Sequence, residues 1–304
     1  MKIGLIGQPK SGKTTIFNAL TKSEAEVTGY SSGKVEPNLA VVTVDDSRVA
    51  RLSEMYKPKK TIYATIEVID FVGVSEGAAK KGLFSGPALG LVRTTDALAL
   101  VVRNFSDETL DGTMGKADPA KDAGNIYSEL ILSDLIITEN RLEKIGNDYR
   151  RGKKTPALQA EEKVLKKIHA TLNAGLPVVS IELTEEEAKV ILGFQFLSQK
   201  PLFVILNSEE KNYGKNEKLV NALGKRFNVI EFAGQFEMEL SRLEAEEALV
   251  FMQDMGIRES ARARLTTFAY QILGYLSFFT VGENEVHAWT IKKGEDAVAA
   301  AGTV

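Results

Sequence analysis

The stretch GQPKSGKTTIFNAL, residues 7–20, lies almost at the start of the 304-residue chain and decides how the rest is interpreted. Its spacing, Gly7-x-x-x-x-Gly12-Lys13-Thr14, is the pattern of a phosphate-binding loop. A short apolar run at residues 2–6 precedes the loop, and a helix-forming run at residues 14–20 follows it. Strand, glycine-rich loop and helix in this order are the context that such a loop requires. These residues therefore predict a site for the phosphates of a nucleotide.

The composition narrows the class of protein. Hydrophobic residues make up 44% of the chain and its formal net charge is −3, so there is enough apolar material for a core and no general excess of basic residues. The chain has no cysteine and only two histidines, His169 and His287, which argues against disulfides and against a transition-metal site. No apolar run approaches the roughly 18 residues that cross a bilayer, and the first residues do not resemble a secretory signal. We expect a soluble, cytoplasmic protein without a membrane partner.

Apolar runs that alternate with helical stretches predict the fold class. After the first run, four more follow, at residues 61–73, 96–105, 201–207 and 228–234. Continuous apolar runs are typical of strands that are buried on both faces, and strands that alternate with helices form a parallel sheet. The sequence therefore predicts an α/β fold with a doubly wound, mostly parallel sheet.

Residues 118–174 break this alternation, because they are helical and carry no strand signal. Positions spaced four and three residues apart form a coiled-coil seam with one polar member, namely Ile131, Leu135, Thr138, Leu142, Ile145 and Tyr149. A turn at residues 150–156 follows, in which Thr155 is the expected N-cap and Pro156 the first residue of a return helix. We expect a helical hairpin that projects from the α/β domain. Two amphipathic helices that lie on the domain surface are the alternative.

Residues of the loop and of the second strand have the chemistry of a triphosphate site. Backbone N–H groups between Pro9 and Thr14 would surround a phosphate, Lys13 would reach the β and γ phosphates, and the Thr14 hydroxyl would hold Mg²⁺. Asp70-x-x-Gly73 is a weak pattern by itself. At this distance from a phosphate loop it predicts a carboxylate at the metal and a glycine N–H that senses the γ-phosphate. Lys13 and Gly73 are therefore the catalytic candidates, and Thr14 and Asp70 are the metal candidates.

Val74 follows Gly73 in the chain. In Ras-like GTPases, a glutamine at this place orients the attacking water. The side chain of valine has no hydrogen-bonding group. We therefore expect slow hydrolysis, or a water that is held by backbone, by the phosphate or by a partner.

The segment Asn207-Ser208-Glu209-Glu210 follows the apolar run at 201–207, where a base-reading motif N/T-K-x-D would lie. In that motif the aspartate accepts hydrogen bonds from guanine. Here Glu210 takes the aspartate position and Ser208 replaces the lysine. The longer carboxylate weakens the case for guanine, so ATP and GTP both stay open as ligands. A polar loop without a binding role is the alternative.

The chain resembles the YchF subfamily of Obg-like P-loop NTPases over essentially its whole length. The resemblance rests on SGKTTIFNALT, KVEPNLAVVTVDDSRVARL, KPKKTIYATIEVIDFVGV, SELILSDLIITENRLEKI, IELTEEEAKVI and AYQILGYLSFFTVGENEVHAWTIKKGEDAVAAAG. It implies a G domain at 1–115 and 195–277, an inserted antiparallel coiled-coil hairpin at 116–194, and the start of a β-grasp-like TGS domain at 278–304. It also implies hydrolysis of ATP, often in preference to GTP, and association with ribosomes.

The resemblance carries over to individual positions of this sequence. The third base loop of the family aligns with residues 233–235. The nucleotide-binding candidates are Pro9, Lys10, Ser11, Gly12, Lys13, Thr14, Thr15, Asn207, Glu210, Ala233, Gly234 and Gln235. Mg²⁺ is the implied cofactor.

The sequence also departs from the family pattern. Lys10-Ser11 replaces the usual Asn-Val of the phosphate loop, and Lys34 stands where the family has its switch I threonine. A lysine cannot coordinate Mg²⁺, and Ser31 or Ser32 are the nearby hydroxyl groups. Residues 75–93, which include Pro87, replace the glycine-rich switch II, and the chain ends early in the TGS domain. We interpret the chain as a divergent member in which nucleotide binding is retained.

Four basic residues, Arg150, Arg151, Lys153 and Lys154, crowd the turn of the predicted hairpin. They favour contact with the phosphates of ribosomal or other RNA, whereas a solvated turn is the alternative. We expect a monomer that acts as a slow, Mg²⁺-dependent ATPase or GTPase and as a ribosome-associated switch. A GTP-binding switch, or a nucleotide-sensing module without useful catalysis, are the alternatives.

Overall fold

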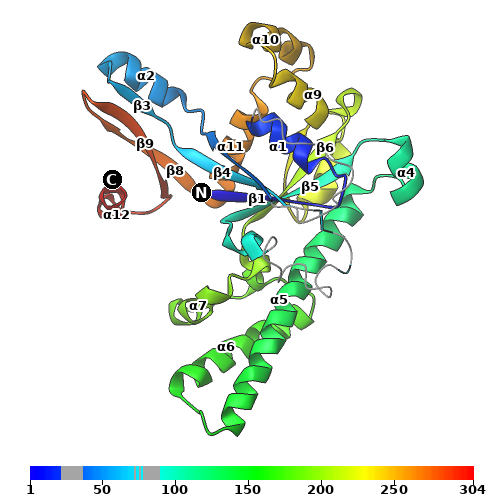
Figure 1. The fold of residues 1–304 in the computed structure, drawn as a ribbon, viewed down its shortest axis with the longest axis vertical. Coiled ribbons are helices and arrows are strands. Elements are labelled where there is room, and N and C mark those ends of the chain that lie inside the picture. The colour runs from blue at the N-terminus through cyan, green and yellow to red at the C-terminus, as the bar shows by residue number, and fades with distance from the viewer. Residues whose placement is uncertain (22–36, 72, 75–76, 78–89) are drawn as a thin grey trace.

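The computed structural model describes residues 1–21, 37–71, 73–74, 77 and 90–304 (Figure 1). A six-stranded sheet lies at its centre, and every neighbouring pair of strands is parallel except β2 and β4. Across the sheet the strands are β2 (Asn38–Thr43), β4 (Thr65–Asp70), β1 (Lys2–Ile6), β5 (Ala97–Asn104), β6 (Leu202–Ser208) and β7 (Asn228–Phe232). The predicted mostly parallel sheet is confirmed. The antiparallel edge strand β2 was not predicted.

The first six residues of strand β5, 97–102, are all apolar because both faces of the strand are covered. Leu98, Leu100 and Val102 pack into the core on one face of the sheet, while Ala99 and Val101 pack into the core on the other face. Successive side chains of a strand point to opposite faces, so a strand that is covered on both sides has no polar position.

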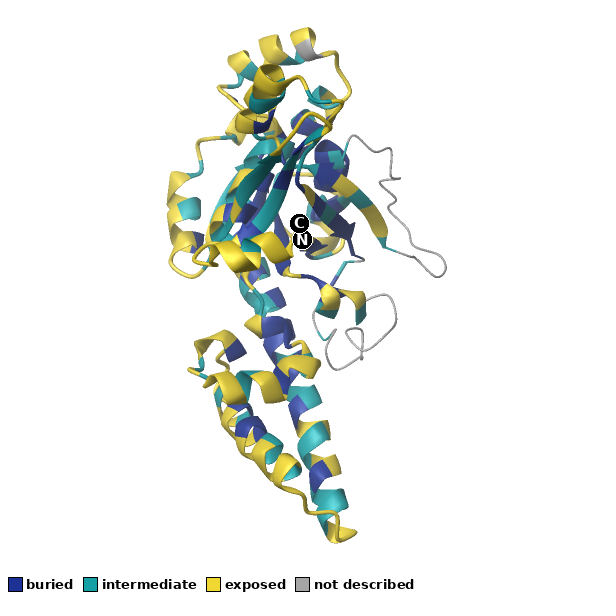
Figure 2. Ribbon diagram, turned by 90° about the vertical axis from the view of Figure 1, so that its left-hand side faces the viewer, coloured by how far each residue is buried: buried dark blue, intermediate teal, exposed yellow. Residues whose placement is uncertain are grey.

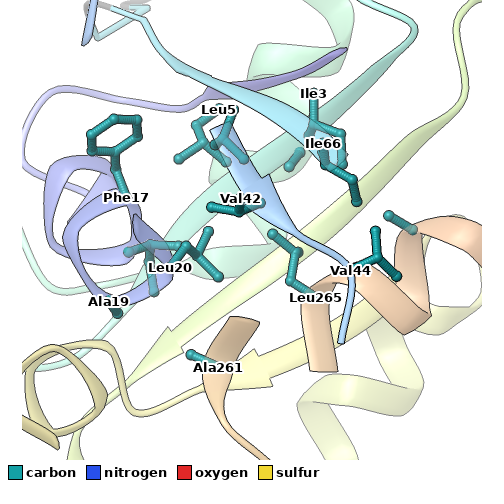
Figure 3. Packing of buried hydrophobic residues seen from close by; sticks show 14 of the residues in the cluster. Ile3, Leu5, Phe17, Ala19, Leu20, Val42, Val44, Ile66, Ala261 and Leu265 are labelled. Atoms are coloured by element: carbon teal, nitrogen blue, oxygen red, sulfur yellow. The ribbon is translucent and has the colours of Figure 1, made fainter. Parts of the chain in front are cut away.

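Helices cover both faces of the sheet. On one face lie α1 (Lys13–Thr21) and α11 (Ala261–Leu273), and Figure 3 shows Phe17, Leu20 and Leu265 of these helices around Leu5 and Val42 of the strands. The N-terminal part of α5 (Pro119–Arg150) and α8 (Glu217–Gly224) supply residues to the core on the other face. The remaining helices of this part are α2 (Ser47–Tyr56), α4 (Glu108–Met114), α9 (Gly234–Leu240) and α10 (Ala245–Asp254).

Helix α5 and its return partner α6 (Pro156–Asn173) form the predicted hairpin, which extends away from the sheet (Figures 1 and 2). Of the two arrangements that the sequence left open, the projecting hairpin is therefore the one observed. Ile131 and Ile145 of the seam are buried against the return helix, together with Thr138, whose hydroxyl donates to the Asp134 carbonyl at 2.8 Å. That internal bond explains how a polar residue is tolerated in the seam.

Capping residues set the start of the return helix α6, as predicted, and the start of the helix α7 that follows the hairpin. The Thr155 hydroxyl accepts the Leu158 N–H at 3.2 Å, with Pro156 in the first turn of α6. Thr184 and Glu187 form both bonds of a capping box at the start of α7 (Glu185–Ile191). Three short 3-10 turns, at Val178–Ser180, Leu192–Phe194 and Leu197–Gln199, connect these helices to the sheet.

The C-terminal strands belong to a second, three-stranded sheet with the order β3-β9-β8. Strand β9 (Glu285–Lys292) is antiparallel to β8 (Tyr275–Val281) and parallel to β3 (Lys60–Ile62), and α12 (Ala297–Gly302) follows. Val286 and Ala288 of β9 lie in the same core cluster as α1 and α11. Strand β8 begins three residues before the predicted Phe278, and the pairing with β3 was not predicted, because local sequence carries no signal of a partner more than 200 residues away. The domain boundaries after residues 115, 194 and 277 stay predictions.

Across the part of the chain that the structure describes, no helix has both the length and the apolar character required to span a membrane.

Candidate phosphate and base site

The phosphate loop joins the end of β1 to the start of α1, and its backbone conformation depends on glycine. Gly12 has φ of +88°, and a Cβ at this residue would lie 2.1 Å from Nδ2 of Asn207. Gly73, from the segment after β4, is packed so closely that its Cβ would lie 2.6 Å from the Pro9 nitrogen. Because these two predicted glycines lack side chains, the phosphate loop lies close to Asn207 at the end of β6 and to the segment after β4.

Lys13 is buried within the loop. Its ammonium group donates to the carbonyl oxygens of Gln8 at 2.7 Å and of Gly7 at 3.2 Å. Burial lowers the pKa of Lys13 to about 8, although the nearby Asp70 carboxylate acts in the opposite direction. The charged group that would bind phosphate is therefore positioned by the loop itself.

Thr14 and Asp70 meet as the sequence predicted. The Thr14 hydroxyl donates to Oδ2 of Asp70 at 2.7 Å, and Nδ2 of Asn38 lies 3.4 Å from the same oxygen. The other oxygen, Oδ1, is buried and has no hydrogen-bond partner among the described residues. Burial raises the pKa of Asp70, while the Thr14 hydroxyl, Lys13 and Asn38 oppose that shift.

This pair of groups fits Mg²⁺. Hydroxyl and carboxylate oxygens are the hard ligands that Mg²⁺ prefers, and the buried Oδ1 of Asp70 lacks the partner that a buried oxygen normally has. Within the described ranges no group of three acidic or histidine side chains is placed to hold a metal by itself. That agrees with a phosphate-loop site, in which the nucleotide and water supply the other ligands.

Val74 does not face the phosphate loop with its side chain. Its N–H donates to the Gly7 carbonyl at 2.8 Å, and its side chain is fully buried in the core beside α5. The position after Gly73 is therefore part of the packing of the sheet. Lys34, Ser31, Ser32 and Pro87, which the sequence singled out in the switch regions, lie outside the described residues.

Asn207 links the phosphate loop to the third base loop. Its Nδ2 donates to the Ser11 carbonyl at 3.1 Å, and its Oδ1 accepts the Gly234 N–H at 3.2 Å. The side chain is 3% exposed. Both ends of the amide therefore hold the frame of the site, a role that the sequence motif alone did not indicate.

A cleft of about 420 Å³ lies beside Gly12 and contains the predicted Thr15, Glu210 and Gln235. Its lining residues are Gly12, Thr15, Phe105, Ser106, Asn207, Ser208, Glu209, Glu210, Gln235, Phe236 and Glu239. Phe105 and Phe236 were missed by the sequence analysis. The only available signal was their position, with Phe105 directly after strand β5 and Phe236 directly after the third base loop. Flat aromatic side chains suit the faces of a nucleobase.

Other predicted residues lie around this cleft rather than in it. Pro9 and Lys10 are exposed on the loop, Lys10 with φ of +61°. Ala233 is buried, and its N–H donates to Oε1 of Glu237 at 3.0 Å. Within the cleft, by contrast, Glu210 is exposed at the start of a short 3-10 turn, Glu210–Asn212, whereas the carboxylate of its neighbour Glu209 binds the Ser106 N–H and Lys211.

The first helix of the hairpin starts beside the phosphate loop. Nε2 of Gln8 donates to Asp122 of α5 at 2.9 Å, and the N–H of Gly77 donates to Glu129 one to two turns further on at 2.7 Å. At the other end of the hairpin, the four predicted cations Arg150, Arg151, Lys153 and Lys154 are all exposed. A single helix therefore runs from the loop to the basic tip.

Comparisons with known proteins agree on one family. Residues 2–134 match the family MMR_HSR1, described as 50S ribosome-binding GTPase, and residues 275–304 match YchF-GTPase_C, described as a protein of unknown function (DUF933). Two relatives, each named "Ribosome-binding ATPase YchF", come from Bacillus subtilis and Haemophilus ducreyi. They are 34% and 35% identical over 308 aligned positions, which cover 99% and 100% of this chain and 84% of each relative.

A solved structure supports the same relationship over the whole chain. The YchF GTPase of Schizosaccharomyces pombe superposes with a TM-score of 0.78 at 28% identity, and the match covers 100% of this chain and 83% of that one. Because relatives that are 34% and 35% identical match 99% and 100% of its length, and this solved structure matches it throughout, the chain belongs to the YchF family.

Proposed function

We propose that this chain binds a purine nucleoside triphosphate together with Mg²⁺, hydrolyses it slowly to the diphosphate and phosphate, and associates with the ribosome. The observation that carries the proposal is the convergence of Lys13, Thr14 and Asp70 next to Gly12, which itself lines the candidate base cleft. ATP is the proposed ligand and GTP its competitor. The names of the relatives, ribosome-binding ATPases, support this assignment.

Each side chain has a defined part in this proposal. Lys13 binds the β and γ phosphates after exchanging its two loop carbonyls for phosphate oxygens. Thr14 and Asp70 hold Mg²⁺, which supplies positive charge next to the phosphates when it is bound. Gly73 offers its N–H to the γ-phosphate, and the absence of a side chain lets it lie against Pro9.

Slow turnover follows from Val74. Because its side chain is fully buried and apolar, it cannot orient a water molecule. A residue or backbone group supplied by a partner would complete the reaction, so we expect the ribosome to raise the rate.

The base is placed between polar and aromatic groups of the cleft. Glu210 and Gln235 provide hydrogen-bonding groups at its mouth, and Phe105 and Phe236 provide apolar walls. Asn207 keeps the two base loops attached to the phosphate loop. A cleft of this size suits a purine with its ribose.

The experiment that tests the proposal is a competition titration of ATP against GTP with Mg²⁺, followed by turnover measurements with and without ribosomes. We expect ATP to bind more tightly by about tenfold, and turnover to disappear in Lys13→Ala. Lys189→Ala, an exposed lysine on α7, is the matched control and should behave as the parent chain. Absence of binding of either nucleotide would refute the proposal.

A second candidate function is favoured by the same burial of Val74. A chain without a water-orienting residue could sense the nucleotide without useful catalysis. Tight binding combined with background hydrolysis, even when ribosomes are present, would select this function over the ATPase.

We propose that the chain contacts the ribosome through the arm, by which we mean the hairpin of α5 and α6. Arg150, Arg151, Lys153 and Lys154 are exposed at its tip, and such cations bind RNA phosphates. We also propose a monomer that works in the cytoplasm, where ribosomes are found, and light scattering on the purified chain would test the oligomeric state.

A further inference from the structure

Arg264 of α11 contacts both loops that line the base cleft, although it does not line the cleft itself. Its Nη1 donates to the Tyr213 hydroxyl at 2.7 Å and to the Glu231 carbonyl at 3.1 Å. Its Nη2 donates to the carboxylate of Glu237. The guanidinium carbon lies 4.5 Å from the centre of the Phe232 ring, so the group is held in its plane as well as by its donors.

Glu237 transmits the position of Arg264 to the third base loop. This carboxylate is 3% exposed, and its second oxygen accepts the Ala233 N–H at 3.0 Å. The next residue, Gly234, donates its own N–H to Asn207. The turn that leads to Gln235 and Phe236 is therefore fixed from one side by the Arg264–Glu237 pair and from the other side by Asn207.

Tyr213 and Glu231 transmit the position of Arg264 to the other loop of the candidate base cleft, the segment 207–210 that carries Glu210. Tyr213 follows the Glu210–Asn212 turn directly, and its N–H binds the Glu210 carbonyl at 3.2 Å. The Glu231 carboxylate accepts the Ser208 hydroxyl at 2.6 Å and the Gly214 N–H at 3.2 Å. The loop that carries Glu210 is thus held at both of its ends by groups next to Arg264.

We propose that Arg264 is a positioning residue that sets the distance between the two base loops, and that it thereby determines how tightly and how selectively the purine base is bound. The inference rests on the proposed nucleotide binding. Arg264 acts only through Tyr213, Glu231 and Glu237. It does not touch the nucleotide.

The chemistry of the side chain explains why arginine is needed. Its planar group has five N–H donors in a rigid fork, so it can serve Tyr213 and Glu237 at the same time. Lysine keeps the positive charge beside Glu237, but its compact ammonium group cannot reproduce both fixed directions. A buried ion pair is weak evidence for stability by itself, whereas contacts at the ends of two loops define a geometry.

The test compares Arg264→Lys with the unmodified chain in competition titrations of three ligands with Mg²⁺, namely ATP, GTP and inorganic tripolyphosphate. Tripolyphosphate engages the phosphate loop and has no base. We expect Arg264→Lys to weaken the preferred nucleotide by about three- to tenfold and to reduce the ratio of ATP to GTP affinity. Binding of tripolyphosphate should change less than about twofold.

Two further variants separate positioning from a general loss of structure. Arg262→Lys is the matched control, because Arg262 lies on the same helix and pairs with Asp45 instead; it should bind all three ligands as the unmodified chain does. Tyr213→Phe removes the Tyr213–Arg264 bond without disturbing the ion pair, so it should reproduce part of the loss even if Arg264→Lys folds poorly.

Three results would overturn the inference. The first is an equal loss for all three ligands, which indicates a purely structural role. The second is nucleotide affinities in Arg264→Lys and Tyr213→Phe that match those of Arg262→Lys. The third is binding of tripolyphosphate but of neither nucleotide by the unmodified chain, which would remove the base site from the proposed function as well.

Discussion

Buried polar side chains of the phosphate loop are held by partners that nucleotide binding has to replace. Lys13 donates to two carbonyls of its own loop, and Asp70 accepts from Thr14. These bonds keep the groups in place without a ligand. At the scale of single residues, the site is therefore pre-formed. We expect the affinity for a nucleotide to depend on the protonation of Lys13 and on the space next to Gly12.

Nucleotide binding should be coupled to proton uptake by Lys13. Its pKa is about 8 in the free protein, and negative phosphates favour the charged form, so the pKa rises on binding. Below pH 8 the free protein already carries the charge and affinity is flat, whereas above pH 8 a proton must be taken up and affinity falls. At pH 8.5 we therefore expect ATP binding to take up a measurable fraction of a proton, larger than at pH 7.5.

Calorimetric titrations at pH 8.5 in two buffers of different ionisation enthalpy measure this uptake directly. A repeat at pH 7.5 is the control, since most of the lysine is then already protonated. Identical enthalpies in both buffers at pH 8.5 would contradict the coupling.

Gly12→Ala should abolish tight nucleotide binding. Alanine at this position would have to adopt an unfavourable positive φ. Its Cβ would also clash with Nδ2 of Asn207, so the hydrogen bond from Asn207 to the Ser11 carbonyl would be broken. We expect the affinity for the nucleotide to fall by more than about tenfold and the free energy of unfolding to fall by about 1–2 kcal/mol. Nucleotide titration and urea unfolding provide the two measurements.

Gly124→Ala in α5 is the matched control, because no atom lies within 4 Å of its Cβ position. It should bind nucleotide normally and be as stable as the parent or more so. Equal binding by Gly12→Ala and Gly124→Ala would show that the loop tolerates a side chain.

Sequence motifs identified some residues of the candidate site and missed others. Lys13, Thr14 and Asp70 were assigned from spacing, and the structure brings them together. The frame made by Asn207 was not predicted, because its partners Ser11 and Gly234 lie in other segments. Phe105 and Phe236 carry no motif, so only their place in the cleft identifies them.

Helix α5 connects the phosphate loop to the tip of the hairpin. Its first half contacts the phosphate loop at Gln8 and the segment after β4 at Gly77, and then it binds Arg93 through Asp134. The Asp134 carboxylate is 0% exposed and also accepts the N–H groups of Leu197 and Ser198. One buried carboxylate therefore fixes the base of the hairpin to the short turns that precede β5 and β6, Leu91–Thr94 and Leu197–Gln199.

Asp134→Asn should loosen this junction. The amide removes the charge that balances buried Arg93 and places donors where N–H groups already point. We expect a loss of about 3 kcal/mol in the free energy of unfolding, measured in urea. Glu143→Gln makes the same change of charge at an exposed site of α5 and should cost less than about 0.5 kcal/mol. Equal stability of the two variants would refute the role of Asp134.

At the scale of the whole molecule, the arm separates two surfaces of different chemistry. The candidate base cleft is lined by residues that follow β5 and β6, whereas the exposed cations lie in the turn between α5 and α6. Figures 1 and 2 show that this hairpin extends away from the sheet. A 32-residue helix spans roughly 48 Å, so the tip reaches well beyond the domain that would hold the nucleotide. This arrangement lets one partner contact the tip without covering the cleft.

Reversal of charge at the tip should weaken ribosome binding. The double variant Arg150→Glu and Arg151→Glu removes two cations that would contact RNA phosphates. We expect co-sedimentation with ribosomes to fall by more than about tenfold and the salt dependence of binding to become shallower. Nucleotide affinity should stay unchanged.

The matched control is the double variant Lys218→Glu and Lys225→Glu, which makes the same change of net charge at exposed positions on and beside α8. It should bind ribosomes nearly as the parent chain does. Equal losses in both double variants would mean that overall charge, and not the tip, governs binding.

The sequence by itself determined most strands of the central sheet and the hairpin, and it predicted the chemistry of the phosphate loop. Continuous apolar runs, the four-and-three spacing of the coiled-coil seam, capping residues and the phosphate-loop spacing are local signals, and each acts within a few residues of the chain. They predicted five strands of the sheet, the hairpin and the residues Lys13, Thr14 and Asp70.

Only the tertiary structure decided which distant segments meet. The pairing of β3 with β9, the frame around Asn207 and the reach of Arg264 to two loops join residues that are far apart in the chain. Such contacts form because the sheet brings the ends of its strands to one edge and the core excludes other packings, and a local pattern does not contain that information.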